Sequence, residues 1–207
     1  KLNITMKLGK EVTAQEVLAL KPYSILVATG SNVISIPLEG LDQVQTVQAH
    51  DVLANDMQFA NKKVVVIGGG ITGLETALYI NRQGTNQVSV VDMLPEWPVD
   101  MLDMRYQNEA LLEVRHCNDQ GVALFYNNKV VKFADGKLFI ESTKDGEVKE
   151  LPADVIVLSV GVKPNDALWQ ELLASGHPSV WKAGDAIATG KINKAVLHGS
   201  KFGYSLN

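Results

Sequence analysis

The stretch VVVIGGGITGLETALYI, residues 64–80, constrains the fold most, because its glycines follow an apolar run and open a helical pattern. Gly68 suits a sharp bend between strand and helix, Gly70 lets a pyrophosphate approach the backbone, and Gly73 allows close packing. The start of the helix adds free N–H groups and the positive end of its dipole. The pattern predicts a dinucleotide-binding βαβ unit; the alternative is a glycine-rich turn that serves packing alone. The residues expected to contact the dinucleotide are Gly68, Gly69, Gly70, Ile71, Thr72 and Gly73.

An acid at the end of the next apolar run indicates which dinucleotide binds. Asp92 lies nineteen residues after Gly73, near the spacing of a carboxylate that binds the adenosine ribose. A carboxylate there accepts the 2′-hydroxyl and repels a 2′-phosphate. The following residues, MLPEWP, contain no Arg or Lys, so the sequence favours NAD(H). The alternatives are a solvated strand end for Asp92 and, for the nearby Trp97, either a cover over the adenine or an ordinary core or surface aromatic.

Strand and helix patterns alternate along the chain, which predicts an α/β fold. We expect a Rossmann-like three-layer domain that combines a parallel sheet with an antiparallel meander over 129–152, where Asp135-Gly136 and Asp145-Gly146 signal the turns. Thr13 and Glu16 form a capping-box pattern at the start of a helix. The expected strands are 1–7, 23–30, 62–70, 87–93, 122–127 and 154–161, and the expected helices are 14–20, 71–83 and 105–120.

Composition excludes several classes of protein. The net charge of −4, with acids and bases interspersed, lacks the basic stripe of a nucleic-acid interface. No apolar run approaches the length of a membrane span, and the first residues do not resemble a signal peptide. The single Cys117 excludes an internal disulfide framework, fits a reducing cytoplasmic location, and shares a helical stripe with Ala110 and Val114 that predicts a buried thiol. The scattered histidines show no metal spacing.

Four segments in order carry a family resemblance: ILVATGS, KVVVIGGGITGLETA, VIVLSVGVKPN and VWKAGDA. Over essentially its whole length the chain resembles the C-terminal FAD/NAD(P)-binding region of the multidomain NADH:flavin oxidoreductases. These are relatives of 2,4-dienoyl-CoA reductase, enoate reductase and trimethylamine dehydrogenase, with a pyridine nucleotide-disulfide oxidoreductase-like fold. The resemblance implies an NAD(H)-binding domain, 61–159, inserted into a partial Rossmann-like FAD-binding domain, 1–60 and 160–207.

The resemblance also implies cofactor-binding residues outside the glycine turn. Asp185 matches the acid that hydrogen-bonds the ribityl chain of FAD, and the segment from Ala28 matches the crossover strand near the flavin. Glu75 falls where an acid lies near the nicotinamide and flavin rings, although its place on the helix equally allows a packing role. The residues assigned in this way are Ala28, Thr29, Gly30, Glu75, Gly161, Gly184 and Asp185.

The function that the resemblance implies is transfer of hydride from NADH to FAD, which then feeds reduction of an electron-poor, for example enoyl-type, substrate in another domain. No catalytic side chain is assigned within this chain. The alternative is a non-catalytic nucleotide-holding or interdomain module, as in the trimethylamine dehydrogenase branch. The intact glycine turn and Asp92 favour the first reading.

In this family the FAD domain starts with a further G-x-G-x-x-G turn. An FMN-binding barrel and cysteines that hold an iron–sulfur cluster precede it. None of these three features is found in the 207 residues. We therefore expect a C-terminal fragment of a larger flavoenzyme, inactive alone and weak in retaining FAD, with the upstream FAD and FMN-barrel domains as its partners. Its open strand edges offer pairing with another copy, so a homo-oligomer is one expected arrangement.

Overall fold

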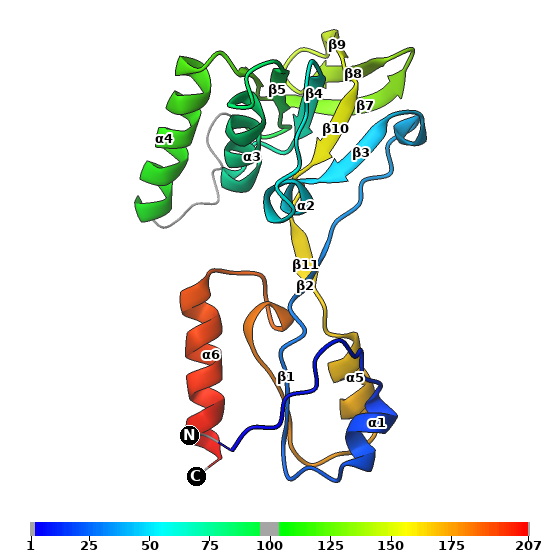
Figure 1. Ribbon diagram of the computed structural model, residues 1–207, viewed down its shortest axis with the longest axis vertical. Helices are drawn as coiled ribbons and strands as arrows, with labels where there is room; N and C mark the ends of the chain where they lie inside the picture. Colours follow the sequence, from blue (N-terminus) through cyan, green and yellow to red (C-terminus); the bar gives the residue numbers. More distant parts are fainter. Residues whose placement is uncertain (1–2, 96–103, 207) are drawn as a thin grey trace. The chain divides into compact units, whose positions relative to one another are not determined.

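The computed structural model describes residues 3–95 and 104–206 and divides the chain into two compact units (Figure 1). The first unit combines Lys1–Ile34 with Val162–Asn207, and the second is Ser35–Gly161. The second unit thus interrupts the first in chain order. The α/β class, with a parallel sheet and an antiparallel meander, is confirmed.

The second unit is built on a five-stranded parallel sheet with the order β3-β10-β4-β5-β6. These strands are β3 (Gln45–Gln48), β10 (Val155–Leu158), β4 (Lys63–Ile67), β5 (Gln87–Val91) and β6 (Ala123–Phe125). The helices of this unit are α2 (Ala49–Ala54), α3 (Ile71–Asn81) and α4 (Met104–Asp119), with a short 3-10 helix η1 (Leu41–Gln43) before β3. Because the central strands are covered on both faces, they are continuous apolar runs rather than alternating ones.

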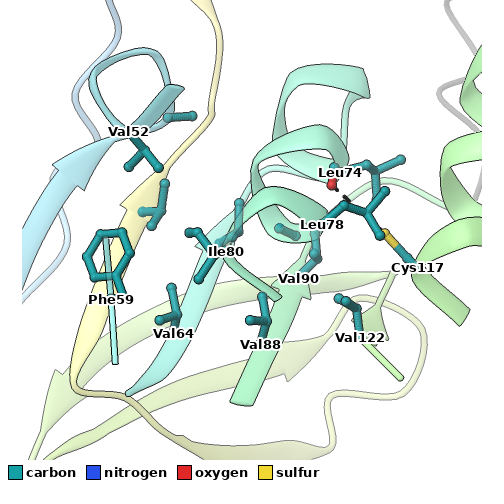
Figure 2. Close-up of a cluster of buried hydrophobic side chains, with 14 of the residues drawn as sticks. Val52, Phe59, Val64, Leu74, Leu78, Ile80, Val88, Val90, Cys117 and Val122 are labelled. Atoms are coloured by element: carbon teal, nitrogen blue, oxygen red, sulfur yellow. Dashed lines mark hydrogen bonds between the residues drawn. The ribbon is translucent and has the colours of Figure 1, made fainter. Parts of the chain in front are cut away.

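The helical face of the sheet carries the larger core of the unit (Figure 2). Leu74, Leu78 and Ile80 of α3 belong to this cluster together with Val64 of β4 and with Val88 and Val90 of β5. On α4, Cys117 is fully buried as predicted, and its thiol approaches the Leu74 carbonyl oxygen at 4.0 Å. Burial raises the pKa of the Cys117 thiol to about 11, so this side chain serves packing.

The opposite face is covered by the antiparallel meander of β7 (Asn128–Ala134), β8 (Lys137–Ser142) and β9 (Val148–Pro152). Phe133, Leu138 and Ile140 of the meander are buried in a second cluster with Ile156 of β10. The β7–β8 turn places Asp135 and Gly136 in the left-handed region, at φ 51° and 72°. The expected three-layer order of helices, sheet and meander is therefore confirmed.

The first unit has a smaller core between short elements. Its strands pair as β1 (Ile25–Val27) with β12 (Val180–Lys182), in parallel, and β2 (Ser31–Val33) with β11 (Val162–Pro164), antiparallel. Its helices are α1 (Ala14–Ala19), α5 (Ala167–Ala174) and α6 (Ile192–Ser205), with a 3-10 helix η2 (Gly184–Ala186). The core joins Ala14, Ile25, Val27 and Leu172.

The capping box that opens α1 is present as predicted. The Glu16 N–H donates to the Thr13 hydroxyl at 3.3 Å, and the Thr13 N–H donates to the Glu16 carboxylate at 3.0 Å. The hydrogen bond from Lys10, followed by that from the Thr13 backbone, lowers the pKa of Glu16 to about 2. This reciprocal cap fixes where the helix begins.

Two sequence expectations differ from the structure. The strand expected over 1–7 is wrong: its described residues belong to none of the sheets, and Ile4 and Met6 are 69% and 71% exposed. An alternating pattern without a neighbouring strand leaves its backbone groups unpaired, so it forms no ladder. Residues 35–60, grouped from the sequence with the FAD-domain segments, supply β3 and α2 to the second unit because β3 pairs with β10.

Within the described residues, no helix has the length and apolar character needed to span a bilayer.

Candidate dinucleotide-binding site

The glycine turn joins the end of β4 to the start of α3, and Gly68 makes the bend. Its φ of 110° is a conformation that L side chains rarely adopt, and a Cβ there would lie 2.3 Å from the Ser159 carbonyl oxygen. The Gly68 N–H donates to the Val91 carbonyl oxygen at 2.8 Å, which ties the turn to the end of β5. Only glycine satisfies both the angle and the space.

Gly73 and Gly70 have opposite surroundings. A Cβ on Gly73 would lie 1.9 Å from the Gly68 carbonyl oxygen, so this glycine lets α3 pack against the turn. A Cβ on Gly70 would have no atom of the described residues within 4 Å. Gly70 is also the N-cap of α3 and provides no side-chain cap, so the first N–H groups of the helix remain for another acceptor. Open space beside uncapped N–H groups fits a pyrophosphate.

Asp92 links the turn to the end of β5. One carboxylate oxygen accepts the Gly69 N–H at 2.6 Å, and the other accepts the Leu94 N–H at 2.8 Å. Each carboxylate oxygen has two acceptor sites, so the carboxylate retains acceptor capacity for a hydroxyl. A Cβ on Gly69 would lie 3.0 Å from Tyr126 Cε1 and 3.2 Å from Asp92 Cβ, which explains why the turn has a fourth glycine at this position.

A hollow of about 450 Å³, called here the carboxyl-edge hollow, opens beside this turn. It lies at the carboxyl ends of β4, β5 and β10. The strand order reverses here, because the chain proceeds from β4 through β5 to β6 on one side and later returns to β10 on the other side of β4. Such a switch point is where open α/β sheets bind ligands. The hollow is lined by Ile36, Ile67, Gly68, Val91, Asp92, Met93, Leu94, Asn128, Lys129, Val130, Ser159, Val160 and Gly161.

Sequence reasoning missed three polar residues of this hollow: Ser159, Asn128 and Lys129. Ser159 directly follows β10, so the rule that carboxyl ends of parallel strands share one edge could have found it. Asn128 and Lys129 begin the meander and carried no local signal. Asn128 is 9% exposed and donates from Nδ2 to the Tyr126 carbonyl oxygen at 2.7 Å, while its Oδ1 has no hydrogen-bond partner among the described residues.

A second hollow, of about 460 Å³, lies within the first unit and brings together two of the segments that resemble FAD-binding ones. Ala28 and Gly30 line it with Gly184 and Asp185. The Asp185 carboxylate accepts the Gly190 N–H at 3.1 Å and the Ser31 hydroxyl at 3.4 Å. We call this the Asp185 hollow; its glycines leave the backbone approachable around one carboxylate.

Other residues assigned from the sequence lie elsewhere. Thr29 donates through its hydroxyl to the Asn165 carbonyl oxygen and lines neither hollow. Glu75 is exposed on α3. Ile71 and Thr72 start α3 beside Gly70, and Gly161 lines the carboxyl-edge hollow. Trp97 lies outside the described residues. Among the residues that the structure describes, no group of His, Cys, Asp and Glu could hold a metal ion.

A glycine turn at the switch point of a parallel sheet, with an acid at the next strand end, defines a dinucleotide-binding protein of the Rossmann class. The family model described as pyridine nucleotide-disulphide oxidoreductase matches residues 3–199. The chain therefore belongs to this family of flavin-dependent oxidoreductases, whose members bind FAD and NAD(P), and the resemblance expected from the sequence is confirmed.

Relatives of the chain are much longer than the chain itself. NADH oxidase of Thermoanaerobacter brockii is 30% identical over 98% of this chain and 31% of its own length. Bilirubin reductase of Mediterraneibacter gnavus is 33% identical over 79% of this chain and 24% of its own length. The structure of 2-naphthoyl-CoA reductase with 2-naphthoyl-CoA superposes with a TM-score of 0.79 at 25% identity, covering 97% of this chain and 29% of that one.

Proposed function

We propose that this chain is the NAD(H)-binding part of a flavin-dependent NADH oxidoreductase. NAD(H) binds along the carboxyl edge of the parallel sheet, with its pyrophosphate over the start of α3 and its adenosine ribose at Asp92. The observation that carries the proposal is the open space at Gly70 beside the uncapped helix start. Packing within the turn explains Gly68, Gly69 and Gly73, where a Cβ would meet neighbouring atoms, but it does not explain Gly70.

The residues also suit FAD in the first unit. The Asp185 hollow offers a carboxylate acceptor for ribityl hydroxyls and a backbone without side chains at Gly30 and Gly184. With both cofactors bound, the nicotinamide would supply a hydride and the flavin would accept it. The chain's own residues bind and orient the two cofactors, and no described side chain is needed to move a proton.

The final substrate lies with other parts of the enzyme. The chain spans 24% and 31% of the two curated relatives named above, which supports additional domains in the parent protein. The names bilirubin reductase and 2-naphthoyl-CoA reductase state that an organic acceptor is reduced, and the name NADH oxidase states that NADH is oxidised. We propose the same class of acceptor, including unsaturated thioesters, for the enzyme that contains this chain.

Titration of the chain with NADH and NADPH by calorimetry tests the proposal. The wild-type chain should bind NADH more tightly than NADPH. Asp92→Ala should weaken NADH binding by at least about tenfold, since a hydrogen bond to a charged group contributes about 1.5–3 kcal/mol. The difference between the affinities for NADH and NADPH should therefore become smaller. Equal affinities, or tighter NADPH binding by the wild type, would contradict the assignment of Asp92.

Asp154→Ala is the matched control for Asp92→Ala. Asp154 also accepts a backbone N–H, that of Lys63 at 2.8 Å, but it does so at the start of β4. This control removes the same charge and the same kind of hydrogen bond at the opposite edge of the sheet. NADH affinity should be unchanged in Asp154→Ala; an equal loss in both variants would mean that the acids act through stability instead of through the ligand.

A further inference from the structure

The structure brings a cation to the carboxyl-edge hollow that the sequence near Asp92 does not contain. Lys129 is the one positively charged residue among the described residues that line this hollow. Two backbone hydrogen bonds hold its neighbours against the Asp92 loop. The Asn128 N–H donates to the Asp92 carbonyl oxygen and the Asn127 N–H to the Leu94 carbonyl oxygen, both at 2.9 Å. Lys129, the second residue of β7, therefore lies in the same hollow as the acid assigned to the ribose.

The charge of Lys129 is already paired. Its Nζ lies 2.9 Å from the Glu141 carboxylate, and Lys129 and Glu141 are direct cross-strand partners of β7 and β8. Their side chains are 49% and 33% exposed, so the pair sits at the rim and not in the core. Of the described residues that line the hollow, Asp92 is thus the one acid and Lys129 the one base, and the charge of Lys129 is already paired with Glu141.

We propose that Glu141 is a specificity-determining residue that favours NAD(H) over NADP(H). Glu141 pairs with Lys129, the one cation among the described residues that line the hollow. The ammonium group of Lys129 is then not available to neutralise a 2′-phosphate beside Asp92. A lysine ammonium is an effective point-charge partner for phosphate, so a free Lys129 would partly offset the repulsion from Asp92. The inference rests on the proposed function, because it requires the dinucleotide ribose to lie at Asp92.

The test is titration of Glu141→Gln with NADH, NADPH, AMP and 2′-AMP. NADPH and 2′-AMP should bind about three- to fivefold more tightly than to the wild type, as expected for an exposed ion pair released to a new partner. NADH and AMP affinities should change by less than about twofold. The gain should shrink as salt is raised, because exposed charges are screened.

Glu150→Gln is the matched control. It removes another cross-strand Lys–Glu pair of the same meander, in which Lys137 Nζ lies 2.5 Å from the Glu150 carboxylate. Neither of these residues lines the carboxyl-edge hollow, so the ratio of NADPH to NADH affinity should equal that of the wild type. In the double variant Lys129→Gln/Glu141→Gln, the gain for NADPH should disappear.

Three outcomes would overturn the inference while leaving the proposed function intact: an unchanged affinity ratio in Glu141→Gln, an equal change in Glu150→Gln, or a gain that persists in the double variant. Circular dichroism of each variant shows whether it has folded. A wild-type chain that binds neither NADH nor AMP would contradict the proposed function itself, and the inference with it.

Discussion

At the scale of the residue, the glycines of the turn differ in what a side chain would meet. Gly73 faces the Gly68 carbonyl oxygen, whereas Gly70 faces open space at φ −70° and ψ 174°, angles that valine adopts readily. Gly70→Val should therefore fold with an unchanged melting temperature and lose NADH binding, because the isopropyl group fills the space for the pyrophosphate. Circular dichroism and NADH titration measure the two effects separately.

Gly73→Ala provides the contrast to Gly70→Val. Its Cβ would collide with backbone, so this variant should melt at a clearly lower temperature. Retention of NADH binding by folded Gly70→Val would place the dinucleotide somewhere other than on this turn.

Some site residues could be predicted and others could not, for a physical reason. The turn glycines and Asp92 follow from a fixed spacing, because one βαβ unit determines their geometry. Lys129 and Asn128 reach the hollow through the pairing of the meander start with the Asp92 loop. Such a long-range contact has no period or spacing in the sequence.

At the scale of the element, the apolar runs of β4 and β10 and the turn signals of the meander predicted their structures, since these patterns reflect burial on two faces and local turn chemistry. The alternating pattern of segment 1–7 predicted a strand wrongly, because a strand forms only where a neighbouring strand pairs with its backbone. The burial of one face of α4 was also predicted, from the stripe that includes Cys117 and Val114, and the structure shows that this face packs on α3.

The packing of α4 on α3 can be tested through the reactivity of Cys117. Cys117 is fully buried between α4 and α3, and burial raises the pKa of its thiol to about 11. Below that pH the thiol is protonated and shielded, so a disulfide reagent should modify the native chain far more slowly than the denatured chain. With a disulfide reagent that releases a coloured thiol, the reaction can be followed by absorbance. Since Cys117 is the single cysteine, the absorbance change reports the accessibility of this helix contact alone. Rapid native labelling at neutral pH would contradict the packing.

At the scale of the whole molecule, the two units have separate cores of unequal size. The first unit buries a cluster of four residues, whereas both faces of the sheet are buried in the second. The smaller core should unfold first. Two of the three tryptophans, Trp169 and Trp181, belong to the first unit. Replacing the third by Trp97→Phe makes the maximum of tryptophan fluorescence report unfolding of the first unit alone. Far-UV circular dichroism reports unfolding of both units.

We expect the emission maximum to shift at a lower urea concentration than the main loss of circular dichroism. Saturating NADH should move only the later transition, because a ligand at 100 times its Kd stabilises the unit that binds it by about 2.7 kcal/mol. Adding Gly70→Val should remove this ligand effect and leave the early transition in place. If both signals changed at one urea concentration and moved together with NADH, the two units would form a single cooperative structure, and the dinucleotide would stabilise both.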